Sequence, residues 1–234
     1  LDRPIIHYGV DEAVTSGCRD IVFVTGRSKR SIEDYFDRSL GLEHLLERRG
    51  QKEVRDDLVR ISEMANFAYV RQSEPLGLGH AVLCGEPCVN DSYFGLILPD
   101  DVILAEKPVL GQLAEVHAAL GGSVLALEKV PWEETSRYGI IEGSECADGI
   151  FRISNLVEKP ASGEAPSRYA IIGRYLLSPT VFRHLRSAKA GVGGEIQLTD
   201  ALRELLAEEP VFGLLYKGER LDCGTQKGWL TATV

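Results

Sequence analysis

Acidic residues follow apolar segments at two places where strands are expected to end. Asp100 and Asp101 come just after the apolar segment 93–98, and Asp222 repeats this pattern near the other end of the chain. A carboxylate in such a position can hold Mg²⁺ beside phosphate groups, because this hard cation prefers oxygen ligands and keeps several of its waters. An Asp-rich turn or a helix cap is the alternative interpretation. The pattern therefore indicates a candidate magnesium site.

A glutamine and a glycine loop lie between an expected strand and an expected helix. Residues 67–70 form a β-type run that precedes Gln72, and Gly77, Gly79 and His80 lie where an apolar helix opens. In open α/β sheets, ligands bind at the carboxyl ends of the strands. A glutamine amide offers a donor and an acceptor to a base edge, and glycines let the backbone approach a flat ring. The segment indicates a nucleobase pocket or, alternatively, a strand-to-helix turn without a ligand.

An acceptor and a cation stand side by side after a third apolar segment. Glu158 and Lys159 follow residues 153–157, and such a pair is useful where sugar hydroxyls and a phosphate must be held together. A solvated turn is the alternative. Gly139 and Gly173 each lie within a β-type run, where a missing side chain indicates close approach by a ligand or a bulge.

Alternating strands and helices must position these residues. The apolar patterns predict one α/β domain with a mixed sheet, without a repeat, a low-complexity tract or a linker. The expected strands cover residues 21–25, 67–70, 93–98, 123–127, 138–142, 151–157, 170–177 and 211–215. The expected helices lie between residues 4 and 17, near 31–36, around 42–46 and 54–61, after residue 79, over 109–120, near 179–185 and over 197–206.

Composition restricts the class of protein. The chain has 234 residues, of which 44% are hydrophobic, and no apolar run approaches the ~20 residues of a membrane span. A net charge of -9 argues against a nucleic-acid-binding surface, which would be basic. The 5 cysteines are odd in number and lack a metal-type pair, so reduced thiols in a cytoplasmic protein are expected.

Ordered blocks of this sequence resemble the bacterial UTP-glucose-1-phosphate uridylyltransferases over nearly the whole chain. The segment FDRSLGLEHLLERR favours this group over the related thymidylyl- and cytidylyltransferases. The blocks are LDRPIIHY, IVFVTGRSKRSIEDYFD, VRQSEPLGLGHAVLC, LILPDD, RYGIIE, VEKP, AIIGRYLLS, GGEIQLTDAL and LDCGTQKGW.

The resemblance implies specific roles for the residues that match the family's motifs. Gln72 and Gly77 would hold the uracil, and Gly79 and His80 would lie close to the ribose. Glu158 would contact glucose hydroxyls together with Gly139. Lys159 would contact the sugar phosphate, and Gly173 would form a wall of the sugar pocket. Asp100 would bind Mg²⁺ with Asp101 as its neighbour, and Asp222 matches a position beside the metal in sister enzymes. Glu195 lies in the matching block GGEIQLTDAL, but a helix cap and turn explain this residue about as well as a functional role does.

The resemblance also implies a Rossmann-like mixed sheet flanked by helices, of the nucleotide-diphospho-sugar transferase type. Residues 1–234 would form one nucleotidyltransferase domain. The family's opening strand and its glycine-rich loop, which carries an arginine and a lysine, have no match here, because Leu1 aligns just after them. If the polypeptide began at Leu1, catalysis would be severely reduced and the sheet would lack a central strand. The expectation is a longer polypeptide at both ends.

Uridylyl transfer is the activity that the resemblance implies. A phosphate oxygen of glucose 1-phosphate would attack the α-phosphorus of UTP in line. Lys159 and Mg²⁺ bound to Asp100 would counter the negative charge that grows on the phosphoryl oxygens. Two alternatives stay open: a nucleotidylyltransferase for another base or sugar, and a non-catalytic regulatory paralogue. A homodimer or homotetramer is expected from the family.

Overall fold

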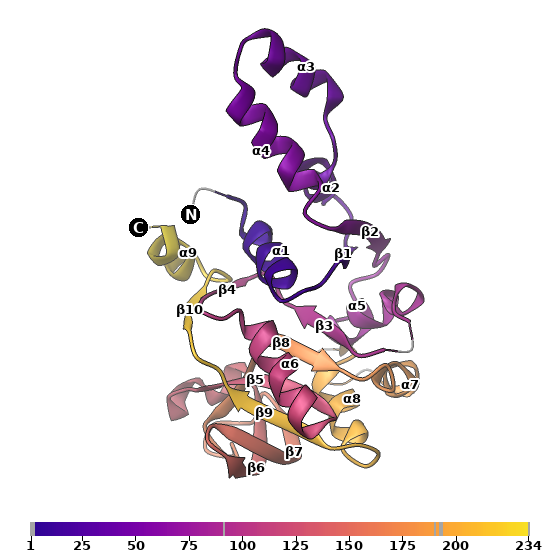
Figure 1. Cartoon of the computed structure of the whole chain (residues 1–234). Helices are drawn as coiled ribbons and strands as arrows, with labels where there is room; N and C mark the ends of the chain where they lie inside the picture. Colours follow the sequence, from indigo (N-terminus) through magenta and orange to yellow (C-terminus); the bar gives the residue numbers. More distant parts are fainter. Residues whose placement is uncertain (1–2, 91, 190, 192–193, 234) are drawn as a thin grey trace.

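The first two strands form a parallel pair with a helical crossover. The computed structural model describes residues 3–90, 92–189, 191 and 194–233 (Figure 1). Strand β1 (Asp20–Thr25) pairs with β2 (Asn66–Arg71). Helices α2 (Arg30–Phe36), α3 (Leu40–Arg48) and α4 (Lys52–Ser62) supply the long connection that parallel strands need. Except for α3, these elements share an apolar cluster with α1 (Ile5–Thr15) that contains Val10, Phe23, Phe36 and Ile61.

The larger sheet has six strands and is mixed. Its order is β3-β8-β5-β9-β7-β6; β5 and β9 pair in parallel, and the other pairs are antiparallel. The α/β class and the mixed sheet predicted from the sequence are thereby confirmed. The strands are β3 (Phe94–Ile97), β5 (Ser123–Lys129), β6 (Gly139–Ala147), β7 (Ile150–Glu158), β8 (Tyr169–Leu177) and β9 (Val211–Leu215).

The strands in the described part of the chain form three sheets rather than the one sheet that the sequence predicts. The chain turns at Pro99 and Asp100, so that β4 (Asp101–Leu104) leaves β3 and pairs antiparallel with β10 (Glu219–Asp222). Within the described ranges no strand ladder joins β1 to β3, and β1–β2 therefore stays a separate sheet. Helix α9 (Gln226–Thr233) follows β10.

Helices cover both faces of the six-stranded sheet. Leu125 and Leu127 of β5 pack in one apolar cluster with α5 (Leu78–Cys84), α7 (Val181–Ser187) and α8 (Leu198–Leu205). Val124 and Ala126 pack in another with α6 (Val109–Leu120). This alternation is what a strand buried on both faces requires, since successive side chains point to opposite faces.

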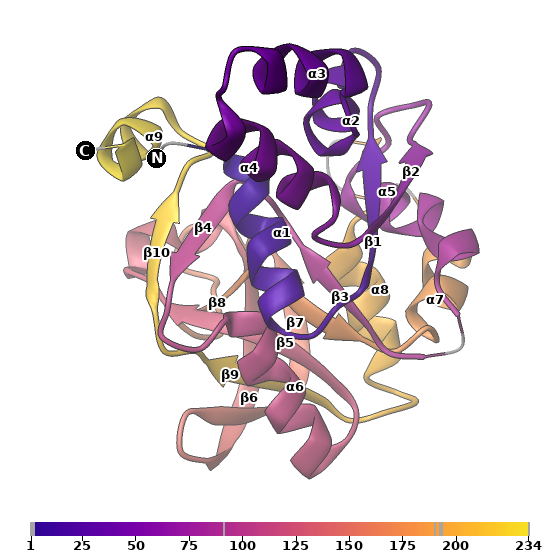
Figure 2. The same ribbon diagram turned by 45° about the horizontal axis from the view of Figure 1, so that its top comes forward.

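The helical crossover forms one end of the molecule. In Figures 1 and 2, α3 and α4 lie at the end opposite β6, away from the six-stranded sheet. Short 3-10 turns at Glu86–Cys88 and Trp132–Arg137 lie within the connections. None of the helices in the part of the chain that the structure describes has the length and apolar character needed to cross a bilayer.

Gly122 is predicted to tolerate alanine much less well than Gly163. Both glycines have left-handed φ, +69° and +83°, which costs an alanine roughly 1–2 kcal/mol. A Cβ at Gly122 would also collide with the carbonyl of Pro210, whereas nothing lies within 4 Å of one at Gly163. We expect Gly122→Ala to lower the free energy of unfolding by about 1–3 kcal/mol more than Gly163→Ala in urea titrations. Equal losses would contradict the collision.

Candidate active site

Two predicted metal ligands face the same glycine. Asp100 follows β3, and Asp222 ends β10. A Cβ placed on Gly224 would lie 3.3 Å from Asp100 Oδ2 and 3.2 Å from Asp222 Oδ1. The Gly224 amide donates to Asp222 Oδ1 at 3.0 Å, and the Cys223 amide donates to the Asp100 carbonyl oxygen at 2.8 Å. The structure thus brings together carboxylates that are 122 residues apart in sequence, by the difference of their numbers 222 and 100.

This pair of carboxylates fits a magnesium ion better than a metal held entirely by protein. Among the described residues, no group of three or more His, Cys, Asp or Glu side chains is placed to hold a metal. Mg²⁺ is commonly bound through one or two carboxylates, with waters and substrate phosphates completing its shell. Asp100 and Asp222 supply that number of ligands. Their role as metal ligands stays a prediction.

Asp101 differs from its neighbour because it already has a cationic partner. Its carboxylate is 11% exposed and lies 3.2 Å from Arg220 Nη1. Burial raises the pKa of Asp101, and the charge of Arg220 opposes this rise. Burial alone would lower the pKa of Arg220, but its hydrogen bond with Tyr138 and the charges of Asp101 and Glu128 raise it. The predicted substrate contact of Asp101 stays a prediction.

Glu158 and Lys159 lie at the end of β7 and are fixed by different neighbours. Thr199 Oγ1 donates to Glu158 Oε2 at 2.6 Å, and a Cβ on Gly139 would stand 3.2 Å from the same oxygen. Lys159 has a left-handed φ of 42°, unusual for a side chain with a Cβ, and its amide donates to the Tyr138 carbonyl oxygen. Its side chain is 51% exposed, and its Nζ lies 3.7 Å from Glu158 Oε1.

Gln72 continues the β1–β2 pairing and turns its amide toward the glycine loop. The Gln72 main-chain amide donates to the Thr25 carbonyl oxygen at 2.9 Å. Its side-chain Nε2 donates to the Gly77 carbonyl oxygen at 3.1 Å and lies 3.0 Å from His80 Nδ1. The predicted grouping of Gln72, Gly77 and His80 is therefore present, with the amide nitrogen bonded inside the protein.

Protein packing already explains three of the predicted glycines. The Gly79 amide donates to the Ile196 carbonyl oxygen at 2.9 Å, and a Cβ on Gly79 would lie 2.7 Å from that oxygen. A Cβ on Gly77 would lie 2.7 Å from the Cβ of Glu195. At Gly173, a Cβ would lie 2.7 Å from the Cβ of Leu98. Their glycine identity needs no ligand, and contacts with a nucleotide or a sugar stay predictions.

Successive contacts connect the predicted residues to one another. Ile196, which packs on the glycine loop, precedes Thr199, which holds Glu158. Lys159 bonds to the Tyr138 backbone, and the Tyr138 hydroxyl accepts from Arg220 Nη2 at 3.0 Å. Arg220 in turn pairs with Asp101. Burial raises the pKa of the Tyr175 hydroxyl, and the nearby charges of Glu158, Asp101 and Asp100 raise it further.

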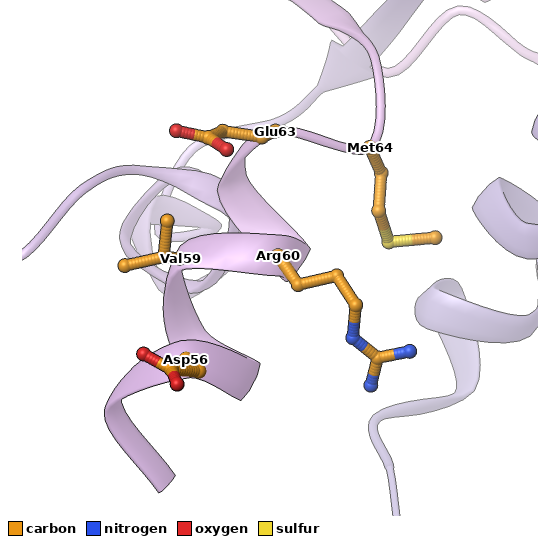
Figure 3. A pocket seen from close by; sticks show the side chains of 5 residues that line it. All are labelled: Asp56, Val59, Arg60, Glu63 and Met64. Carbon is orange, nitrogen blue, oxygen red and sulfur yellow. The ribbon is translucent and has the colours of Figure 1, made fainter. Parts of the chain in front are cut away.

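Two surface hollows lie outside this set of residues. The first is about 480 Å³ and lies along α4, where Figure 3 shows Asp56, Val59 and Glu63 on one side and Arg60 and Met64 on the other. The second is about 450 Å³ and is lined by residues near the ends of β1 and β2. These residues are Arg27, Ser28, Arg30, Ser31 and Arg71. The candidate active site is therefore defined by its contacts and not by either hollow.

Thr199, Arg220 and Arg174 were not identified from the sequence pattern. Thr199 donates to Glu158, and Arg220 pairs with Asp101. Arg174 bonds to the backbone on both sides of Asp100. Arg174 had a usable signal, because a charged residue within an apolar buried strand requires a partner. The partners of the other two could not be inferred from spacing.

Comparison with known proteins places the chain in a family. The Nucleotidyl transferase model matches residues 1–234. UTP--glucose-1-phosphate uridylyltransferase YngB of Bacillus subtilis is 45% identical, over 100% of this chain and 78% of the relative. The UTP--glucose-1-phosphate uridylyltransferase of Pseudomonas aeruginosa is 42% identical, over 100% of this chain and 84% of the relative.

Solved structures give the same result. A UDP-glucose pyrophosphorylase complexed with UDP-glucose superposes with a TM-score of 0.91 at 39% identity, over 100% of this chain and 86% of that one. The UTP-bound enzyme of Acinetobacter baumannii gives a TM-score of 0.90 at 34% identity, over 99% of this chain and 81% of that one. The resemblance seen in the sequence is confirmed, and the chain belongs to the nucleotidyl transferase family.

Proposed function

We propose that this protein transfers a uridylyl group from UTP to glucose 1-phosphate, giving UDP-glucose and pyrophosphate. Relatives with 42% and 45% identity carry that activity in their names, and similar structures contain UDP-glucose or UTP. The observation that carries the proposal is the convergence of Asp100 and Asp222 at Gly224, connected through Arg220 and Tyr138 to Lys159.

The reaction is an in-line displacement at phosphorus. A phosphate oxygen of glucose 1-phosphate forms a bond to the α-phosphorus of UTP, and the bond from this phosphorus to the bridging oxygen breaks as pyrophosphate leaves. No bond to the protein forms, so the side chains act by alignment and by countering charge. Lys159 fits this task because its side chain is half exposed, where it can meet a phosphate, while its backbone is fixed on Tyr138.

The remaining residues divide between the two ends of the product. Gln72 and Gly77 would hold the uracil, and Gly79 and His80 would lie near the ribose. Glu158 would accept hydrogen bonds from glucose hydroxyls. Gly139 leaves room for the Glu158 carboxylate beside Thr199. A Cβ at Gly139 would lie only 3.1 Å from Thr199 Oγ1 and 3.2 Å from Glu158 Oε2. Gly173 and Asp101 would complete the sugar and phosphate side.

Enzymes of this family use a divalent cation, and we propose Mg²⁺ held by Asp100 and Asp222. When bound there, the cation would neutralise charge on the phosphates of UTP.

We also propose a homodimer or homotetramer in the cytoplasm, where the five cysteines, all free in the structure, would stay reduced. Light scattering after size-exclusion chromatography would determine the assembly.

The assay that tests the function supplies UTP, glucose 1-phosphate and Mg²⁺ and measures UDP-glucose and pyrophosphate by chromatography. We expect both products in equal amounts. The same assay with ATP, CTP, GTP and dTTP, and with galactose 1-phosphate, separates the proposal from a related enzyme of other specificity. Binding of UDP-glucose without turnover would favour a regulatory paralogue and would contradict the proposal.

Lys159→Ala is predicted to keep the fold while turnover collapses. Loss of one group that stabilises developing charge costs on the order of 10²- to 10³-fold in rate. The side chain is half exposed, so its removal leaves no buried cavity. Lys129→Ala, at an exposed lysine at the end of β5, is the matched control and should retain turnover. Near-normal turnover of Lys159→Ala would remove its assigned role.

Asp100→Asn is predicted to raise the cation requirement. The substitution keeps the shape of the side chain but removes one of two negative ligands, and we expect turnover to fall on the order of 10²-fold or more. Titration of activity with Mg²⁺ should shift its midpoint upward. Asp148→Asn, in an exposed turn, provides the control. An unchanged Mg²⁺ midpoint for Asp100→Asn would show that this carboxylate is not a ligand.

A further inference from the structure

A buried guanidinium group holds the turn that carries Asp100. Arg174 of β8 is 1% exposed, and its contacts lie on both sides of Pro99 and Asp100. Its Nη1 donates to the Leu98 carbonyl oxygen at 3.0 Å, and its Nη2 donates to the Asp101 carbonyl oxygen at 2.7 Å. The turn between β3 and β4 is thus fixed at its two ends by one rigid planar group.

Glu12 neutralises this arginine and ties it to two helices. Arg174 Nε donates to Glu12 Oε2 at 2.9 Å, and Glu12 Oε1 accepts from the Leu110 amide at 3.1 Å. Glu12 belongs to α1 and is 9% exposed. Desolvation of a buried ion pair often cancels its attraction, so that apolar residues of similar size give equal or greater stability. Stability alone is therefore a weak reason for a charged pair at this place.

We propose that Arg174 is a positioning residue that orients the Asp100 carboxylate toward the cation site that it shares with Asp222. This inference rests on the proposed function, in which Asp100 and Asp222 hold the cation. The far side of the turn is fixed by the Cys223 amide, which donates to the Asp100 carbonyl oxygen at 2.8 Å. With both sides held, the Asp100 side chain has a defined direction before any ligand binds.

Lysine cannot replace this arginine. A guanidinium presents donors in a fixed planar fork, whereas an ammonium group is a point charge on a flexible stem. One ammonium group cannot span the carbonyls of Leu98 and Asp101 and also reach Glu12 in the same geometry. Arg174→Lys therefore keeps the positive charge beside Glu12 but loses the paired hydrogen bonds to the turn. This variant separates the neutralisation of Glu12 from the positioning of the turn.

The decisive experiment compares Arg174→Met with the double variant Arg174→Met/Glu12→Gln. The single variant leaves the charge of Glu12 buried without a partner and should lose stability. The double variant buries no charge, and the amide oxygen introduced by Glu12→Gln can still accept from the Leu110 amide, so unfolding in urea should show most of that stability restored. If Arg174 positions the turn, the double variant should still be defective in cation binding and in the order of residues 98–101.

Two measurements report on the turn itself. Hydrogen exchange followed by mass spectrometry should show faster exchange of the amides in residues 98–104 in Arg174→Lys and in the double variant. Mn²⁺ binding in the presence of UTP alone, followed by electron paramagnetic resonance, should weaken about 10-fold or more, the usual effect of losing a group that orients metal ligands. Neither measurement requires turnover.

Ser123→Ala provides the control. Ser123 is fully buried, donates to Glu209 at 2.6 Å and accepts from the Ser178 amide at 3.0 Å. It should lose stability without a change in exchange at residues 98–104 or in Mn²⁺ binding. A stable double variant with wild-type exchange and wild-type Mn²⁺ affinity would overturn the positioning role. If the Arg174 variants exchange faster but the wild-type protein makes no UDP-glucose, the proposed function is overturned while the role of Arg174 in holding the turn stays supported.

Discussion

The gathering of three carboxylates beside the β4–β10 pair is the constraint on which this site depends. The β4–β10 pairing puts Asp101 opposite Asp222, next to Asp100. Burial raises the pKa of Asp101, and the charges of Asp100 and Asp222 add to this rise. Arg220 pairs with Asp101, and Arg137 Nη2 lies 3.4 Å from Asp222 Oδ2. Across the described ranges, Asp100 is the carboxylate of the three without an ion-pair partner. A bound cation would give Asp100 the opposite charge that Arg220 and Arg137 give to its two neighbours.

Tyr138 connects that charge balance to the sugar side. Its ring lies under the guanidinium groups of Arg137 and Arg220, at 5.5 and 5.4 Å, and its hydroxyl accepts from Arg220. Its carbonyl oxygen accepts from the amide of Lys159 and so supports the left-handed backbone there. Such strained residues persist only where their surroundings over-determine them, and they gather at functional sites. The strain at Lys159 is therefore consistent with a placed ammonium group rather than a solvated turn.

Local pattern was sufficient for most elements and for the grouping of strand-end residues. Long apolar strands such as β8 are recognisable because both faces are buried, whereas β4 is too short to show a period. What spacing could not reveal were partners far apart in the chain: Arg174 and Glu12 are separated by 162 residues, and Arg220 and Asp101 by 119. Spacing also could not show that the remote residue Ile196 packs against Gly77 and Gly79, whose contacts with a ligand stay predictions.

The same segment couples the two halves of the proposed binding region. The Ile196 amide donates to the Leu76 carbonyl oxygen at 2.8 Å, and three positions later Thr199 holds Glu158. Helix α8, which contains Thr199, is fixed by the fully or nearly buried side chains of Leu198, Leu202 and Leu205. Because buried side chains in a close-packed core resist displacement, the loop beside Gln72 and the end of β7 share one rigid support. The packing of α8 in the core therefore supports both the glycine loop beside Gln72 and the end of β7 that carries Glu158.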